Sequence, residues 1–397
     1  MSITVEKYGG TSVKDSARLK EIAARIAERK KENEDIVVIV SAPSGMTDSL
    51  IKRAKEISEV PKGREFDVLL STGEQVSIAL LAMALKEVGV KAISYTASQL
   101  GIVTCGNHNE ARIQSVNTDL IREKIAEGYV IIVPGFQGVC EDGNITTLGR
   151  GGSDTSAVAI AAALGCKSVD IYTDVNGIYS ANPQIIPGAI KHKEVSFSEM
   201  IELAGSGAKV LHTRSVELGA KYGIEIHLRS AFDWQEGTFV RSDEKVESAV
   251  IRGISGFGNL VRISYKSDKL RLSETVNTIS KKGINIDLIT HTMETNGGDE
   301  ITCIVKEDYF EEAVEALNTI SSPEDEILVE KGLAKVSVIG LGVRSKGIAA
   351  SVFEILEKEG IEIHAVSCSE INISCIITEE DLNKAQNALH KKLIEEE

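Results

Sequence analysis

The chain has 397 residues, of which 42% are hydrophobic and 26% charged, as is typical of a soluble globular protein with two or three domains. Its formal net charge of −15 disfavours anionic partners, so neither nucleic acid nor a membrane surface is expected to bind. The six cysteines lack metal-ligand spacing, the N-terminus lacks a signal-peptide pattern, and no apolar run approaches the roughly 20 residues that cross a bilayer. We therefore expect a cytoplasmic protein.

The first half of the chain alternates apolar runs with helical patterns. Apolar, largely β-branched runs predict buried strands at residues 3–5, 36–40, 91–95, 129–133 and 167–172. Between them apolar residues recur at helical spacing, as at Leu19, Ile22 and Ile26. Such alternation predicts an α/β fold with a mostly parallel central sheet and helices on both faces.

Clusters of glycine, serine and threonine follow several of these segments, at residues 7–12, 41–48, 71–74 and 146–157. In parallel α/β sheets ligands bind at the carboxyl ends of the strands, and glycines let backbone N–H groups approach an anion. Because two clusters carry a cation, Lys7 and Arg150, a polyphosphate site is a better interpretation than a set of plain turns. In the last cluster we expect Ser153 or Asp154 to cap the following helix.

A polar, turn-rich linker at residues 234–249 precedes a C-terminal part that repeats itself. The Gly-Ile-Asn-Ile-Asp sequence at residues 283–287 is echoed by Gly-Ile-Glu-Ile-His at residues 360–364. Each follows an amphipathic helix and precedes a strand and a second helix, which predicts two ferredoxin-like β-α-β-β-α-β modules. The predicted domains are residues 1–233, 250–323 and 330–397.

The motifs of several enzyme classes do not occur in the sequence. There is no P-loop, no G-x-G-x-x-G after the first strand and no G-x-S-x-G, and the seven histidines do not cluster. Lone histidines such as His108 and His212 are more often structural than catalytic. The sequence thus offers phosphate cradles and cations without a nucleophile or a base, which fits a substrate that supplies its own nucleophile.

Five sequence blocks and the tandem modules resemble the aspartate kinases. Lys-Tyr-Gly-Gly-Thr-Ser at residues 7–12 is similar to the K-F-G-G-T-S motif of that family, and four blocks follow in the family's order at residues 71–74, 149–154, 172–179 and 207–212. The resemblance covers essentially the whole chain. It implies an amino-acid-kinase fold followed by two ACT domains. It also implies phosphoryl transfer from ATP, with Mg²⁺, to the β-carboxylate of L-aspartate, the first step of lysine, threonine and methionine biosynthesis.

The resemblance implies roles for single residues. Lys7 would stabilise charge as the γ-phosphoryl group leaves, and Asp154 would orient Lys7 or a magnesium-bound water. The residues implied to bind aspartate are Arg150 for a carboxylate, Glu74 for the amino group, Thr47 and Ser153. Those implied to bind ATP are Lys7, Gly9, Gly10, Ser12, Thr173, Asp174, Tyr179 and Lys209. Because a β-carboxylate with a reference pKa of roughly 3.9 is ionised at neutral pH, no general base is needed.

Some features leave alternatives open. Without the resemblance, Lys209 would be interpreted as a surface lysine on a helix. No residues are assigned as metal ligands. The family usually has Asp-Pro-Arg where this chain has Asn-Pro-Gln at residues 182–184, so one cation for the ATP phosphates is missing. Other hypotheses are a glutamate or carbamate kinase, which the ACT pair disfavours, and a non-catalytic amino-acid sensor, which the intact Lys7 and Arg150 disfavour.

The ACT pair implies regulation by an end product such as lysine or threonine. The positions expected to bind it are Asn285, Asp287 and His291, although a polar strand end at a dimer surface explains them nearly as well. We expect a homodimer or a homotetramer assembled through the ACT domains.

Overall fold

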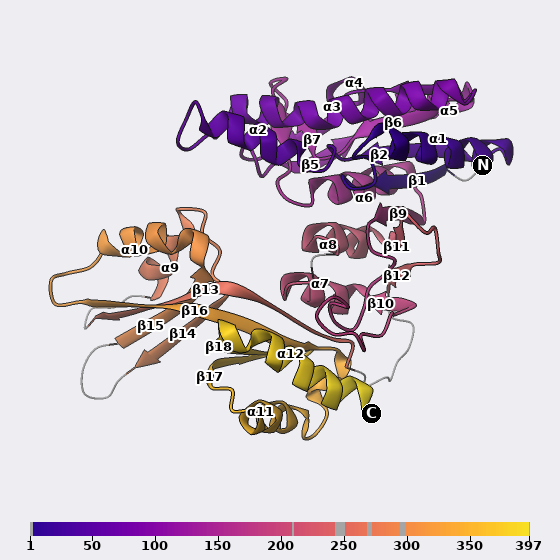
Figure 1. Cartoon of the computed structure of the whole chain (residues 1–397). Coiled ribbons are helices and arrows are strands. Elements are labelled where there is room, and N and C mark those ends of the chain that lie inside the picture. The colour runs from indigo at the N-terminus through magenta and orange to yellow at the C-terminus, as the bar shows by residue number, and fades with distance from the viewer. Residues whose placement is uncertain (1–2, 209, 243–250, 268–271, 294–298, 397) are drawn as a thin grey trace. The chain divides into compact units, whose positions relative to one another are not determined.

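The computed structural model describes residues 3–208, 210–242, 251–267, 272–293 and 299–396 (Figure 1). Over these residues the chain divides into two compact units. Unit 1 comprises Met1–Tyr179, Lys191–Ala204 and Lys209–Val246. Unit 2 comprises Ser180–Ile190, Gly205–Ala208 and Glu247–Glu397. The predicted domain boundaries stay predictions, and residues 243–249 of the predicted linker lie outside the described residues.

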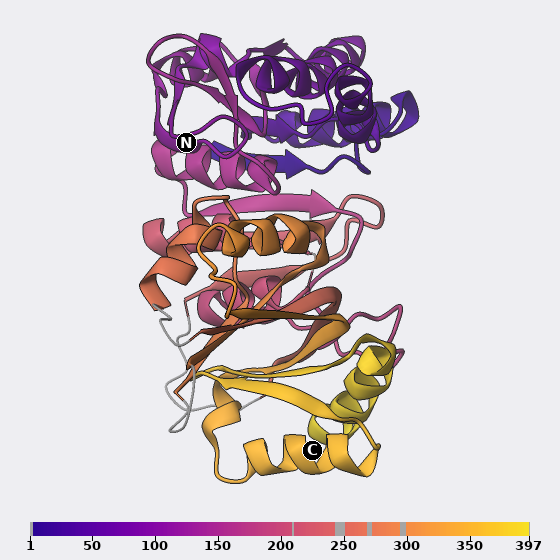
Figure 2. The ribbon, with the colours of Figure 1, turned by 90° about the vertical axis from the view of Figure 1, so that its left-hand side faces the viewer.

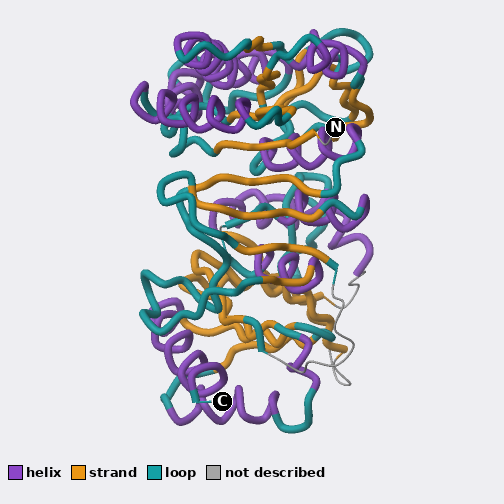
Figure 3. Tube along the Cα trace, turned by 90° about the vertical axis from the view of Figure 1, so that its right-hand side faces the viewer, coloured by secondary structure: helices purple, strands orange, loops and turns teal. Residues whose placement is uncertain are grey.

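In the described part of unit 1, eight strands form a central sheet in which all pairs except β11–β12 are parallel (Figure 3). In spatial order they are β10 (Glu194–Ser196), β12 (Thr238–Arg241), β11 (Glu225–Ser230), β9 (Ser168–Thr173), β1 (Ile3–Tyr8), β2 (Asp35–Val40), β6 (Val130–Pro134) and β3 (Ala92–Ser94). The five strands predicted from apolar runs correspond to β1, β2, β3, β6 and β9. The mostly parallel α/β sheet is confirmed.

Helices cover this sheet on both faces (Figure 1). The helices of this part of the chain are α1 (Ser16–Lys31), α2 (Met46–Lys55), α3 (Arg64–Glu87), α4 (Ala97–Leu100), α5 (Asp119–Ala126), α6 (Gly152–Leu164), α7 (Phe197–Gly205) and α8 (Thr213–Tyr222). α1 and α3 share one hydrophobic core with alternate residues of β2, namely Ile36, Val38 and Val40. α6 packs against β1, β2 and β9. α6 therefore lies close to the loops that follow these three strands.

Helix α3 begins earlier than the sequence indicated. The helix was expected from about Gln75, with residues 71–74 at a strand end, but α3 starts at Arg64 and includes them. By length and composition α3 could cross a membrane, which corrects the expectation that no apolar segment is long enough. Half of its apolar window is buried, and its buried face carries Asp67, Ser71 and Glu74. A buried face with two carboxylates indicates a core helix of a folded domain.

Within residues 3–208, four short strands form a second sheet that the sequence did not predict. In spatial order they are β5 (Arg112–Val116), β4 (Ile102–Cys105), β7 (Gln137–Val139) and β8 (Ile145–Thr147). β8 packs against α3 and leads directly into the glycine-rich turn before α6. This sheet therefore supports the turn that carries Arg150.

The described residues of unit 2 form a six-stranded antiparallel sheet (Figure 2). In spatial order its strands are β14 (Leu288–Met293), β15 (Asp299–Lys306), β13 (Gly253–Ser267), β16 (Glu326–Ile339), β18 (Asn372–Thr378) and β17 (Ile363–Cys368). Its α-helices are α9 (Leu272–Ser280), α10 (Phe310–Asn318), α11 (Ile348–Lys358) and α12 (Leu382–His390). One hydrophobic core forms around α9 and α10 and another around α11 and α12, as expected for two modules.

The long strands β13 and β16 belong to both modules. Residues 260–266 of β13 pair with residues 326–333 of β16, whereas residues 253–257 pair with residues 335–339. The first half of β16 is thus the last strand of the first module, and the first half of β13 completes the second. Both modules have the predicted ferredoxin-like arrangement, but the final strand of the second one precedes its other elements in the chain.

Candidate functional site

The carboxyl ends of four neighbouring strands meet at one edge of the central sheet of unit 1. The backbone N–H of Gly9, just after β1, donates to the carbonyl of Tyr172 in β9 (3.0 Å). The N–H of Ser41 after β2 donates to Tyr8 in β1 (3.1 Å), and the N–H of Gly135 after β6 donates to Val40 in β2 (2.9 Å). The predicted clusters after β1 and β2 therefore lie side by side, where ligands bind in such sheets.

A buried ion pair joins β1 to α6 at this edge. The Nζ of Lys7 lies 2.5 Å from Oδ1 of Asp154, in the first turn of α6, and both side chains are about nine-tenths buried. A Cβ on Gly9 would lie 3.5 Å from the same Nζ, so the backbone after β1 passes beside the ammonium group. The two residues implied to be catalytic are therefore in direct contact.

The turn before α6 differs from its prediction in one respect. Neither Ser153 nor Asp154 caps the helix, because the N-cap residue is Gly151 and no side chain bonds there. Gly149 and Gly151 have φ angles of 75° and 69°, a backbone conformation that glycine adopts without strain. These two glycines make the turn, which leaves the Asp154 carboxylate free to face Lys7.

Close backbone contacts bring the remaining loops together. A Cβ on Gly10 would lie 2.8 Å from the carbonyl oxygen of Ala42, and one on Gly135 would lie 2.6 Å from the Cβ of Ser153. Ser12 is buried, and its hydroxyl has no hydrogen-bond partner among the described residues. The loop after β1 thus presents a buried polar group beside glycine backbone, a suitable environment for an anion.

Glu74 places a buried carboxylate next to the loop after β2. Its Oε1 accepts the backbone N–H of Ala42 (3.1 Å), whereas its Oε2 has no hydrogen-bond partner in the described part of the chain. Glu74 is only 3% exposed, and this burial raises the pKa of its carboxyl group to about 7. Thr47 is half-buried in the first turn of α2, which follows the same loop. A buried acceptor without a partner indicates a place for a donor, such as a substrate ammonium group.

Arg150 is exposed on the glycine turn, and its guanidinium has no ion-pair partner among the described residues. His212, at the start of α8, packs against this turn, because a Cβ on Gly151 would lie 2.2 Å from its ring. Partial burial lowers the pKa of His212, and the negative charge of Asp154 opposes that shift. His212 therefore adjoins the site although its isolation in the sequence favoured a structural role; its position in the fifth motif block was the available signal.

The structure brings only some of the residues implied to bind the nucleotide close together. Thr173 is the last residue of β9 and Asp174 follows it, beside Gly9; the hydroxyl of Thr173 donates to Asp174 (3.1 Å). The hydroxyl of Tyr179 donates to Asn176 (2.6 Å), farther along the same segment. Lys209 lies outside the described residues. No group of three or more potential metal ligands occurs among the described His, Cys, Asp and Glu residues.

The three positions expected to bind an effector lie in unit 2. Asn285 is exposed, and the carboxylate of Asp287 lies 3.4 Å from the ammonium of Lys335 on β16. His291 on β14 lies 3.5 Å from Asp299. Asp287 and His291 thus have separate ion-pair partners.

Comparisons with known proteins agree with these motifs. Residues 2–230 match the amino acid kinase family, and residues 336–393 match the ACT domain. The chain is 43% identical to the aspartokinase of Geobacillus stearothermophilus, covering 98% of this chain and 97% of that one. E. coli aspartokinase III in complex with aspartate and ADP (R-state) is similar in structure, with a TM-score of 0.84, 25% identity and coverage of 99% of this chain and 100% of that chain. The same E. coli protein in complex with lysine and aspartate (T-state) gives a TM-score of 0.74 at 25% identity, with 99% of both chains covered.

Proposed function

The chain belongs to the aspartokinases of the amino acid kinase family, and from this premise we propose which of its residues carry out the reaction. The enzyme transfers the γ-phosphoryl group of ATP to the β-carboxylate of L-aspartate, giving 4-phospho-L-aspartate and ADP. A carboxylate oxygen forms the new bond to phosphorus while the bond to the β-phosphate oxygen breaks. No proton has to move, so the enzyme acts by positioning and by stabilising charge.

The buried ion pair between Lys7 and Asp154 carries the proposal for the phosphoryl site. A lysine held at a fixed place is a preorganised cation for the negative charge that moves to the β-phosphate oxygen. Asp154 keeps the ammonium directed into the site. Gly9, Gly10 and Ser12 supply backbone and hydroxyl groups to the same phosphates. Thr173, Asp174, Tyr179 and Lys209 are proposed to bind the rest of the nucleotide.

Mg²⁺ is proposed to enter with ATP rather than to occupy a site made by the protein alone. Proteins usually bind this ion through one or two carboxylates, with phosphate oxygens and water as the other ligands. Asp154, and Asp174 at the end of β9, are carboxylates of the required kind. When bound, the ion neutralises charge on the phosphates.

Four residues are proposed to bind aspartate. The unpaired Oε2 of Glu74 suits its ammonium group, and the free guanidinium of Arg150 suits a carboxylate in the bidentate manner of such pairs. Thr47, in the first turn of α2, and Ser153, in the first turn of α6, add hydroxyl groups.

Arg150→Ala tests the acceptor site. We expect the KM for aspartate to rise about a hundredfold, because a charge-assisted contact to the substrate is lost, whereas the KM for ATP stays nearly constant. Rates of hydroxylamine-trapped aspartyl phosphate would measure both constants. Arg53→Ala, which removes an exposed arginine from α2, is the matched control. An unchanged KM for aspartate in Arg150→Ala would refute the role of Arg150.

We also propose that lysine, threonine or both regulate the enzyme at Asn285, Asp287 and His291. The carboxylate of Asp287 lies 3.4 Å from the ammonium group of Lys335. The ammonium group of an amino-acid effector could take the place of Lys335 in this ion pair. Asp287→Asn should therefore raise the effector concentration for half-inhibition about tenfold. Assays with lysine, threonine and both together would measure it, with Glu362→Gln in the second module as the control. Equal inhibition of the variant and the parent protein, or no inhibition of the parent protein, would contradict this site.

Assembly as a homodimer or homotetramer is proposed to use unit 2. The edge strands β14 and β17 of the described sheet expose apolar side chains, namely Ile289, Met293 and Val366. Exposed strand edges of this kind pair readily with another copy of the chain. We further propose a cytoplasmic location, where the six free cysteines would stay reduced.

A further inference from the structure

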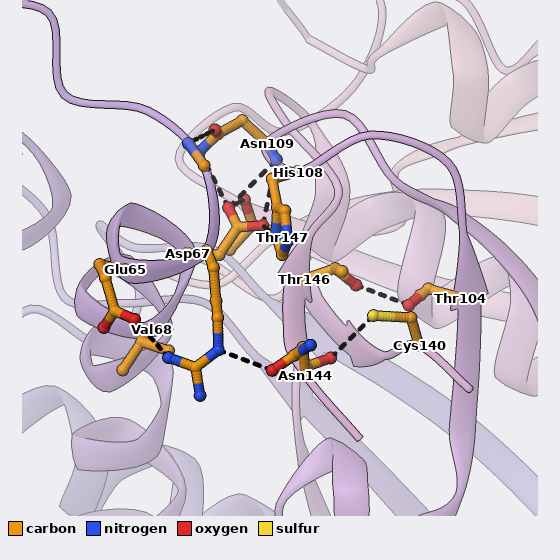
Figure 4. Close-up of polar contacts among 12 residues, drawn as sticks. Glu65, Asp67, Val68, Thr104, His108, Asn109, Cys140, Asn144, Thr146 and Thr147 are labelled. Atoms are coloured by element: carbon orange, nitrogen blue, oxygen red, sulfur yellow. Dashed lines mark hydrogen bonds and ion pairs between the residues drawn. The ribbon is translucent and has the colours of Figure 1, made fainter. Parts of the chain in front are cut away.

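A buried carboxylate at the start of α3 gathers donors from two other segments (Figure 4). Asp67 is fully buried, and its Oδ1 accepts the hydroxyl of Thr147 (2.5 Å) and the side-chain amide of Asn109 (2.9 Å). The backbone N–H of Asn109 lies 3.1 Å from both carboxylate oxygens, and Nδ1 of His108 lies 2.7 Å from Oδ2. We call Asp67, His108, Asn109 and Thr147 the Asp67 network.

The Asp67 network holds the chain three residues before Arg150. Thr147 ends β8, and the next residue, Leu148, is buried and has its carbonyl bonded by Nη1 of Arg214 (2.8 Å). A Cβ on Gly149 would lie 2.9 Å from the carbonyl oxygen of Asn109, so the turn passes directly over the network. The segment leading to Arg150 is thus fixed by hydrogen bonds and by a close backbone contact.

The same helix that carries Asp67 also carries Glu74. The two residues are seven positions apart, about two helical turns and roughly 10 Å, and both lie on the buried face of α3. The first turn of α3 therefore anchors the Arg150 turn, and a position two turns farther along the helix holds the carboxylate proposed to bind the substrate ammonium group. A helix is a rigid spacer between such groups.

We propose that the Asp67 network positions Arg150 relative to Glu74, so that the carboxylate and ammonium ends of L-aspartate are bound together. This inference rests on the roles proposed above for Arg150 and Glu74. Asp67 is fully buried, so its carboxylate acts through the turn and not by touching the substrate. An arginine on a glycine-flanked turn has many conformations, and fixing the base of the turn lowers the entropy lost when substrate binds.

Thr147→Val tests this inference, because it removes one hydroxyl donor to Asp67 and keeps the side-chain shape. We expect the KM for aspartate to rise about tenfold, as for the loss of one hydrogen bond to a charged group, and the KM for ATP to change less than about twofold. Thr147→Ser, which keeps the hydroxyl, should restore the KM for aspartate. Thr104→Val is the matched control, since it removes the buried Thr104–Thr146 hydroxyl contact (2.6 Å) in the same small sheet (Figure 4).

A double variant separates positioning from general damage to the sheet. If Thr147 acts through Arg150, adding Thr147→Val to Arg150→Ala should change the KM for aspartate less than about twofold. A further tenfold rise in the double variant, an equal rise in Thr104→Val, or an unchanged KM in Thr147→Val would overturn the inference. Arg150→Ala alone reports on the proposed substrate site, so failure of that proposal is seen separately.

Discussion

Lys7→Met is expected to lower kcat about a thousandfold, because the variant loses the fixed cation that stabilises charge on the departing ADP. Methionine keeps the length of the apolar stem of a buried side chain, so the local packing is retained. Steady-state production of ADP in the presence of aspartate would measure the change. Lys14→Met, at an exposed lysine shortly after the same loop, is the matched control and should keep the parent rate.

Loss of the Lys7 ammonium also leaves the Asp154 carboxylate buried without its cation, which destabilises the folded protein. Thermal unfolding of Lys7→Met should therefore begin at a lower temperature than that of the parent protein. Adding Asp154→Asn removes the uncompensated charge and should recover part of the stability but none of the turnover. Appreciable turnover in folded Lys7→Met would exclude the proposed role of Lys7.

Glu74→Gln is expected to stabilise the protein without ligand and to weaken aspartate binding. The folded-state pKa of about 7 lies above the ordinary value of 4.5 for a glutamate side chain, so the folded protein keeps a proton that the unfolded chain releases. Stability therefore falls as pH rises from about 4.5 to 7, by about 3 kcal/mol for a shift of this size. Glutamine carries no charge, so the variant should exceed the parent protein in urea resistance at pH 8 and match it near pH 4.5.

The effect of Glu74→Gln on catalysis should have the opposite sign. At pH 8 the KM for aspartate should rise about a hundredfold, because the substrate ammonium group loses a buried carboxylate partner. The KM of the parent enzyme should rise as pH falls through 7, and the KM of the variant should not. Glu87→Gln, at an exposed position on the same helix, is the control. A parent enzyme whose KM is constant between pH 6 and 8 would disagree with this role for Glu74.

The buried strands could be predicted because their hydrophobicity pattern alone indicates them. The continuous apolar, β-branched runs that became β2 and β6 are typical of strands buried on both faces. The small sheet β5-β4-β7-β8 gave no such signal, because its strands have three to five residues and several exposed positions. The polar residues 71–74 suggested a loop, whereas burial of Ser71 and Glu74 against the rest of unit 1 extends α3 through them.

The candidate site, too, could be predicted only in part. Sequence motifs identified Lys7 and Asp154, but their contact depends on β1 and α6 meeting at the sheet edge. The Asp67 network could not be predicted, since Asp67 and His108 are 41 residues apart and Thr147 is 80 residues from Asp67. Hydrogen bonds across such separations leave no local pattern in the sequence.

The shared strands of unit 2 limit how this chain can be cut and recombined. A gene fragment that ends before β16 lacks the last strand of the first ACT module, and one that begins after β13 lacks a strand of the second. Residues 180–190 also belong to unit 2, where the N–H of Ile254 donates to the carbonyl of Ser180 (2.7 Å). Exchange of regulatory modules between related enzymes should therefore succeed only when β13 through α12 is transferred as one piece, with residues 180–190 matched to it.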